Sequence, residues 1–162
     1  MKKFQHKFLH LLLLVLIKIL KYTPLLAQKD IYDSLRYEIL RSQNEKVILS
    51  NYILLTGKTA NSSFTETLRL INEGMHLAIH RNDSLSIAML NRNTGIAYFI
   101  SGSYDKATFY FYESLNYFER KKDAANIALV LTDIAKVYRA SYNLKKSLSF
   151  YEKALAIFVS LK

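Results

Sequence analysis

The sequence has no cysteine, one proline and only four glycines in 162 residues. Without cysteine it can form no disulfide, thiolate metal site or thiol nucleophile, and it can carry no lipid-modified cysteine. An all-β fold needs turn residues at intervals of about 8–12 positions, and so few glycines and prolines argue against it. The composition is 51% hydrophobic, with abundant Leu, Ile, Ala, Lys and Glu. We therefore predict one all-α domain with a substantial core.

Residues 1–27 have the order of features that is typical of a secretory signal peptide. A basic start is followed by an apolar run over residues 11–17, then by Pro24 and the small residue Ala27. We predict cleavage near Ala27 and an exported protein, either periplasmic or secreted. The alternative is an uncleaved membrane anchor. Two lysines inside the segment make insertion into a membrane costly, because a membrane-spanning helix needs about 20 mainly apolar residues.

The net charge is +10, and it falls to +5 once residues 1–27 are removed, because these hold five lysines and no acidic residue. The remaining basic residues are scattered, with the doublets Lys121-Lys122 and Lys145-Lys146 the densest. Nucleic-acid binding needs basic groups clustered on one face. We therefore expect no nucleic-acid partner and interpret the doublets as solvated helix faces.

The sequence repeats with a period of forty residues. The pattern Asp-x-x-x-Ile-Ala at residues 83–88 returns at residues 123–128, and Tyr98 returns as Tyr138. One period earlier the copy is degraded, since Lys58 stands where the repeated Tyr belongs. Such a period indicates a solenoid built from stacked supersecondary units. The predicted units are residues 43–82, 83–122 and 123–162.

Each unit carries two helical patterns separated by turn residues. In the second unit an Asp cap starts a helix over residues 83–100, the Ser-Gly-Ser at residues 101–103 ends it, and a second helix covers residues 104–120. The small residues Gly95 and Ala135 stand at equivalent positions. They would allow the paired helices to approach closely.

The order small residue, Tyr, turn Gly, Tyr, Ala over residues 95–107 resembles the tetratricopeptide repeat, as does the ending Tyr-Glu-Lys-Ala-Leu at residues 151–155. The resemblance covers residues 83–162 well and 43–82 weakly. A period of forty departs from the family's usual 34 and is similar to that of exported or membrane-tethered bacterial sensor proteins. The resemblance implies a right-handed superhelical solenoid of antiparallel helix pairs. Apolar residues at helical spacing predict a leading helix over residues 28–42.

No residue set indicates catalysis or a cofactor, and we predict no enzyme. His76 and His80, at i and i+4, are weak candidates for a metal site, because no HExxH motif or third ligand accompanies them. Thr-Gly-Lys-Thr at residues 56–59 resembles the end of a phosphate loop but lacks its first Gly, so we interpret it as a turn between helices. Asp133 and Lys136 predict an ordinary surface ion pair.

In the family that the chain resembles, the first helix of each pair lines a concave groove that binds proteins or peptides. The resemblance assigns to this groove Met89, Arg92, Asn93, Ile96, Phe99, Leu129, Thr132, Asp133, Lys136 and Arg139. Arg92 with Asn93 could grip a carboxylate or a peptide backbone. The carboxylate clamp of chaperone-binding members is not reproduced, because Asp133 and Leu129 stand where basic residues belong. We therefore expect no chaperone tail as ligand.

Residues 104–118 contain seven aromatic side chains. The repeat accounts for Tyr104, Phe111 and Phe118, which fall on one helical stripe that we expect to pack against neighbouring helices. As the second helix of its pair, this segment should lie on the outer side, away from the groove. Surplus to the repeat are Phe109, Tyr110, Tyr112 and Tyr117.

The leading hypothesis is a non-enzymatic scaffold that binds a protein or peptide in its groove. The alternative is the regulatory region of a bacterial signalling protein whose output domain is absent from this chain. A third is metal binding through His76 and His80. No polar capping helix follows the last repeat, although solenoids need one for solubility. Self-association, a partner or a truncated gene would each account for that open face.

Overall fold

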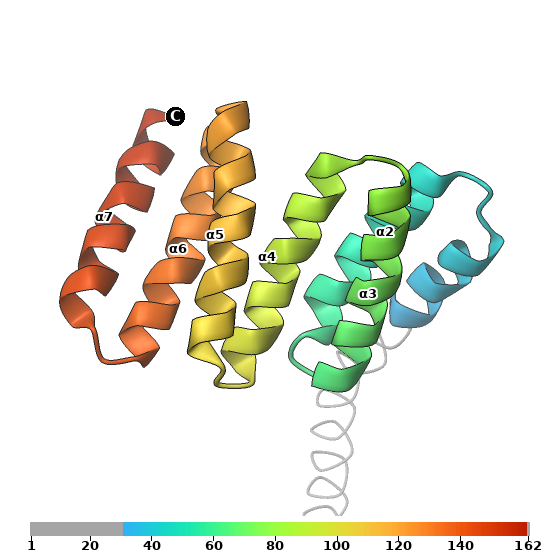
Figure 1. Ribbon diagram of the computed structural model, residues 1–162, viewed down its shortest axis with the longest axis horizontal. Helices are drawn as coiled ribbons and strands as arrows, with labels where there is room; N and C mark the ends of the chain where they lie inside the picture. Colours follow the sequence, from blue (N-terminus) through green and yellow to red (C-terminus); the bar gives the residue numbers. More distant parts are fainter. Residues whose placement is uncertain (1–30, 162) are drawn as a thin grey trace, which may run out of the picture.

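The computed structural model describes residues 31–161, and within them every regular element is a helix, as predicted (Figure 1). Residues 31–41 are helical and precede α2. The other helices are α2 (Glu45–Thr59), α3 (Phe64–His80), α4 (Ser84–Ile100), α5 (Tyr104–Lys121), α6 (Ala124–Ala140) and α7 (Leu144–Ser160). The predicted signal peptide lies outside the described residues. No helix in the described part is both long and apolar enough to cross a membrane.

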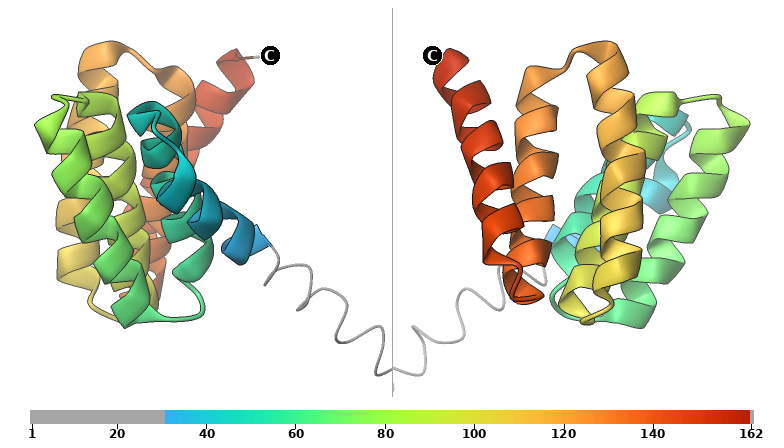
Figure 2. Two further views of the ribbon diagram at one scale, coloured as in Figure 1. Left: turned by 90° about the vertical axis from the view of Figure 1, so that its right-hand side faces the viewer. Right: turned by 60° about the vertical axis from the view of Figure 1, so that its left-hand side comes forward.

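The helices form two layers that continue from pair to pair (Figures 1 and 2). Each helix packs on the next along the chain, and in addition α2 contacts α4 and α4 contacts α6. In the other layer, α3 does not contact α5 directly, and α5 does not contact α7. The helices α2, α4 and α6 are therefore the more closely spaced layer, which puts them on the inner side of a curved solenoid. We call their free face the inner face.

Aspartates start two of the inner helices. The side chain of Asp83 accepts a hydrogen bond from the backbone N–H of Ser86 at 3.0 Å, and Asp123 accepts one from that of Asn126 at 3.1 Å. The Ser86 N–H lowers the pKa of Asp83. For Asp123 the side-chain amide of Asn126 lowers the pKa most, followed by its N–H. These bonds satisfy donors that a helix start leaves open, and the predicted helices over residues 83–100 and 104–120 are confirmed.

The turns also repeat at the level of the backbone. Gly102, between α4 and α5, has φ +78°, and its counterpart forty residues on, Tyr142, has φ +58°. Asn82 and Lys122, which join one pair to the next, both have φ +54°. Only Gly enters this left-handed region at no steric cost. The repeated unit therefore imposes its turn geometry even where the side chain does not favour it.

The interpretation of residues 56–59 as a turn is wrong, because they form the last turn of α2. The Thr56 hydroxyl donates to the carbonyl of Tyr52 at 2.8 Å, one helical turn back. From α3, the Thr67 hydroxyl donates to that of Thr59 at 2.9 Å, with both residues buried. The threonine hydroxyls therefore have hydrogen-bond partners within α2 and α3. The resemblance of residues 56–59 to the end of a phosphate loop gave no indication of these contacts.

The helical residues 31–41 contact the first pair of helices. The Tyr32 hydroxyl donates to the carbonyl of Lys58 at 2.8 Å, at the end of α2. Arg36 forms an ion pair with Glu66 of α3. This segment therefore lies against α2 and α3 at the first edge of the stack.

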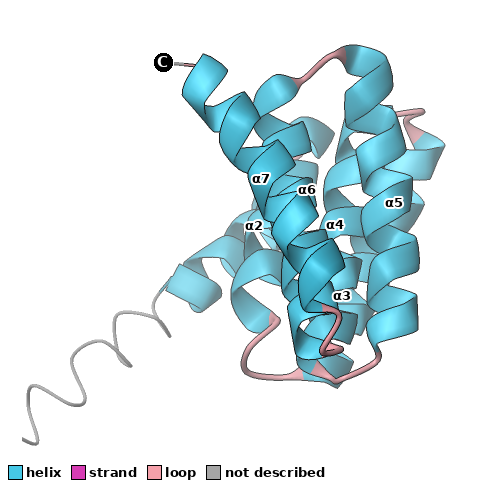
Figure 3. Ribbon diagram, turned by 90° about the vertical axis from the view of Figure 1, so that its left-hand side faces the viewer, coloured by secondary structure: helices cyan, strands magenta, loops and turns pink. Residues whose placement is uncertain are grey.

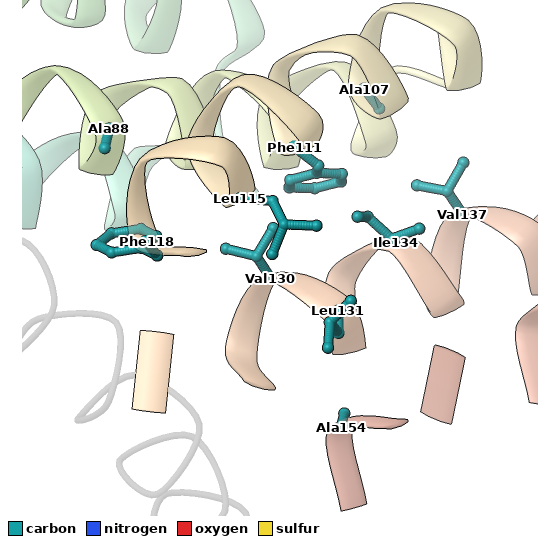
Figure 4. Packing of buried hydrophobic residues seen from close by; sticks show 10 residues of the cluster. All are labelled: Ala88, Ala107, Phe111, Leu115, Phe118, Val130, Leu131, Ile134, Val137 and Ala154. Carbon is teal, nitrogen blue, oxygen red and sulfur yellow. The ribbon is translucent and has the colours of Figure 1, made fainter. Parts of the chain in front are cut away.

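The aromatic stripe of α5 forms the centre of the core. Phe111, Leu115 and Phe118 are buried, and Figure 4 shows them projecting from α5 toward Val130 and Ile134 of α6. The predicted stripe, which packs one repeat against the next, is confirmed. Burial of each such side chain contributes about 1.5–3 kcal/mol, so this contact is the main junction between the second and third helix pairs.

The four surplus aromatics have different surroundings. Tyr110 stacks on Tyr98 of α4 with ring centroids 5.6 Å apart and an interplanar angle of 6°. Tyr117 is half-buried at the edge of the core. Phe109 and Tyr112 are exposed, one helical turn apart on the outer helix α5. Most of the seven aromatic rings are therefore used in packing, while Phe109 at 59% and Tyr112 at 36% remain partly exposed.

Replacing Gly95 by alanine should destabilise the fold. A Cβ at Gly95 would lie 2.6 Å from the buried Phe111 ring, closer than packed atoms can approach. We expect the free energy of unfolding to fall by about 1–3 kcal/mol, although alanine itself favours a helix by about 1 kcal/mol. Gly57→Ala is the control, because its nearest neighbour, the Asn93 side chain, is 3.8 Å away. Urea unfolding followed by circular dichroism should show Gly57→Ala as the more stable variant; the reverse order would contradict the close contact.

Candidate binding groove on the inner face

A buried carboxylate joins the second and third helix pairs. Arg92 of α4 donates from Nε to Oδ2 of Asp133 at 2.8 Å, and Lys136 donates from Nζ to Oδ1 at 2.9 Å. The Asp133 side chain is only 5% exposed. The predicted pair between Asp133 and Lys136 exists, but it is not an ordinary surface pair. Its carboxylate is buried and shared with a cation 41 positions earlier in the sequence.

This cluster borders a hollow of about 260 Å³ between α4 and α6. Its lining includes groove residues assigned by the resemblance, namely Arg92, Ile96, Phe99, Asp133 and Lys136, together with Asn61, Ile100 and Phe111. Ile96 and Phe99 supply an apolar wall. Two cations and one carboxylate leave a net positive charge beside that wall. The hollow can therefore accept an acidic group next to an apolar side chain.

Asn93 does not face this hollow. Its side chain is buried, and Nδ2 donates to the carbonyl of Ile53 at 2.9 Å and to the hydroxyl of Thr56 at 2.8 Å. Both amide donors therefore join α4 to α2. Because Arg92 turns toward α6 and Asn93 toward α2, the two side chains do not form one ligand grip.

A second hollow, of about 550 Å³, lies at the start of the inner helices. It is lined by Lys46, Ser50, Ile53, Asp83, Leu85, Ser86, Met89, Asp123 and Asn126. Two carboxylates and one lysine give it a net negative charge. The sequence pointed only to Met89 here. The sequence identifies Asp83 and Asp123 as helix caps forty positions apart. It does not show that they share a hollow, because the lining comes from α2, α4 and α6, which belong to three different units.

The remaining assigned residues lie on α6 beside the hollows. Leu129 and Arg139 are exposed. Thr132 is half-buried, and its hydroxyl donates to the carbonyl of Ala128 at 2.8 Å. None of the three lines either hollow. They could extend a contact along α6.

The two histidines lie on the other layer. His76 and His80 are both exposed on α3. Within residues 31–161 no group of three or more His, Asp or Glu side chains is placed to hold one metal ion. The pair thus lacks a third protein ligand among the described residues.

Stacked helix pairs with a hollowed inner face define a helical-repeat protein of the kind that serves as an interaction scaffold. A model of the tetratricopeptide repeat family matches residues 85–158. This segment, which covers nearly all of α4 to α7, consists of tetratricopeptide repeats. Comparisons with curated proteins and with solved structures found no match. The family supports a role in protein–protein interaction.

Proposed function

We propose that this chain is a non-enzymatic scaffold whose inner face binds an extended segment of a partner protein. The observation that carries the proposal is the convergence of Arg92, Ile96, Phe99 and Lys136 on one hollow beside a buried carboxylate. Concave sites with an apolar wall and a few fixed polar groups are the usual form of a binding site.

The two hollows differ in charge along the inner face. Lys136, 43% exposed, and Arg92 make the hollow near the ends of α4 and α6 positive. Asp83 and Asp123 make the hollow near the starts of those helices negative. A bound segment would place its acidic part near Lys136 and its basic part near the aspartates, since complementary charges set the orientation of a ligand.

Peptides selected from a random displayed library with the full chain as bait would test the groove. Lys136→Ala and Met89→Ala each alter one hollow, and we expect each to weaken the selected peptides by about tenfold, as central interface residues do. Arg120→Ala is the control, because Arg120 is exposed on the outer helix α5. Equal affinity of all three variants, measured by fluorescence anisotropy, would count against the groove.

A regulatory role in a bacterial signalling protein is the second candidate. Its support is the period of forty, which the helix starts at residues 84 and 124 keep, together with the predicted export signal. DNA downstream of Lys162 should then encode an in-frame kinase or DNA-binding region, and an intergenic gap would contradict this.

Export predicts that protein recovered from the envelope fraction begins near Gln28. A start at Met1 would instead indicate an uncleaved anchor.

A further inference from the structure

The turn between α6 and α7 combines an exposed aromatic ring with exposed lysines. Tyr142, in the turn, is 91% exposed, and Lys145 and Lys146, in the first turn of α7, are exposed as well. Residues 134–151 contain four basic residues and no acidic one. This part of the surface is therefore positive, with an aromatic ring at its tip. We call Tyr142, Lys145 and Lys146 the turn patch.

Two members of the turn patch depart from the preceding repeat at a cost in stability. Tyr142 has φ +58° where the preceding repeat has Gly102, and only Gly enters this left-handed region without steric cost. Lys145 stands where α5 has Asp105, although the open N–H groups of a first helical turn favour an acidic side chain. Both side chains are exposed, so packing does not offset either cost. Local rules broken in this way are expected where a surface has a function.

A further repeat after α7 would leave the turn patch exposed. The equivalent positions forty residues earlier are Gly102, Asp105 and Lys106, and all three are exposed although α6 and α7 follow them. The exposure of the patch therefore does not depend on where the sequence ends.

The turn patch lies on one edge of the solenoid. The turns at residues 60–63, 101–103 and 141–143 follow one another along this edge (Figures 1 and 3). With the four adjoining residues of each helix, they hold five basic and two acidic residues, a net charge of +3. One of the acidic residues, Glu66, already pairs with Arg36 and Arg69. The edge as a whole is therefore positive.

The chain also enters the solenoid at this edge. The Tyr32 hydroxyl donates to the carbonyl of Lys58, in the last turn of α2, at 2.8 Å. The apolar run at residues 11–17 ends fourteen positions before residue 31, a distance of at most about 50 Å along an extended chain. A membrane that holds this run, during export or as an anchor, is therefore within reach of the edge.

The geometry of the turn patch favours a flat partner that meets α7 end-on. Lys145 and Lys146 are consecutive in a helix and so point about 100° apart, and Nζ of Lys146 lies 5.2 Å from the ring centroid of Tyr138. A segment laid along one side of α7 would reach only one of these lysines. A lipid surface that faces the edge reaches both, and tyrosine is enriched where proteins meet the headgroups of a bilayer.

We propose that the turn patch binds the surface of an anionic lipid membrane. The ring of Tyr142 lies at the level of the headgroups, and Lys145 and Lys146 contact lipid phosphates. The contact turns the ends of α4 and α6 toward the membrane. It lies on an edge, whereas the groove lies on the inner face, so the proposal does not depend on the groove.

A tryptophan reporter tests the contact. The chain has no tryptophan, so Tyr142→Trp in the full chain gives a single emitter at the patch. We expect vesicles of phosphatidylglycerol to shift its emission to shorter wavelength, and brominated lipid to quench it. Vesicles of phosphatidylcholine give the background due to the apolar run at residues 11–17. Arg120→Trp, exposed near the opposite edge, is the control. Quenching at residue 142 that does not exceed this background, or that is equal at residue 120, would overturn the proposal.

Charge variants separate the patch from the net charge. Lys145→Gln with Lys146→Gln should weaken binding to phosphatidylglycerol vesicles by about 25-fold, or about fivefold for each cation lost. Lys121→Gln with Lys122→Gln removes the same charge at the opposite edge and should weaken binding less than about threefold, because salt screens distant charges. Equal losses would overturn the proposal. So would tighter binding of polyglutamate than of the vesicles, because the partner would then be an acidic protein.

Restoring the residues of the preceding repeat separates binding from stability. Tyr142→Gly with Lys145→Asp should raise the midpoint of thermal unfolding by about 2–8 °C and weaken vesicle binding by at least about tenfold. Circular dichroism measures the midpoint, and vesicle co-sedimentation measures the binding. A lower midpoint or unchanged binding would contradict the proposal, because the two side chains would then serve the fold alone.

Discussion

Leu115→Ala should lower the free energy of unfolding by about 2–5 kcal/mol, whereas Leu155→Ala, the same change forty residues later, should cost about 0.5 kcal/mol or less. Leu115 is 5% exposed between α5 and α6, and Leu155 is 62% exposed on α7. Both lie inside an outer helix at the same position of the repeat. The change in helix propensity is therefore equal, and the difference isolates burial against the next helix pair.

Urea unfolding of the two variants, followed by circular dichroism at 222 nm, measures this difference. Phe118→Ala is the internal check, because Phe118 is fully buried in the same cluster and should cost about 3–5 kcal/mol. Similar losses at Leu115 and Leu155 would mean that the exposed apolar face of α7 around Leu155 is covered in solution. A loss at Leu155 that grows with protein concentration would identify a second copy as the cover.

Asp133→Ala should lower the free energy of unfolding by about 2–4 kcal/mol. The change removes the acceptor of two charged hydrogen bonds and leaves the guanidinium of Arg92, 20% exposed, without that partner. Breaking a fully buried ion pair costs about 3–5 kcal/mol, and partial exposure of Arg92 reduces this value. Lys136→Ala should cost about 1 kcal/mol or less, because Lys136 is 43% exposed and water screens its charge.

A double-mutant cycle between Arg92→Ala and Asp133→Ala measures the link between the two repeats. We expect a coupling energy of about 1–3 kcal/mol, since the two residues are in direct contact. A matched cycle between Arg69→Ala and Glu73→Ala, an exposed pair within α3, should give about 0.5 kcal/mol. Equal coupling in the two cycles would show that burial adds nothing to the pair at Asp133.

Local signals account for what could be predicted about the helices. Asp83 is followed by a helix that runs to Ile100, as its capping pattern indicates. Gly95 meets the ring of Phe111, as the need for close approach predicted. These features depend on a few residues near one another in sequence or on one helical period. They could therefore be predicted without knowing how the pairs stack.

Contacts between repeats could not be predicted in the same way. The sequence placed Arg92 and Asn93 together, yet one side chain reaches Asp133 on α6 and the other reaches Ile53 on α2. The direction in which each side chain points depends on how α4 is rotated about its own axis relative to α2 and α6. The negative hollow was missed for the same reason, because helices from three units meet there.

The sequence by itself determined an all-α repeat with a period of forty residues, because caps, turns and apolar spacing act over short distances. Only the tertiary structure decided which copies of an equivalent position are buried. Leu115 and Leu155 are the same residue at the same place in the repeat, but their exposure differs more than tenfold. The physical reason is that a solenoid buries each face with the next unit, so burial depends on the neighbour as well as on the residue.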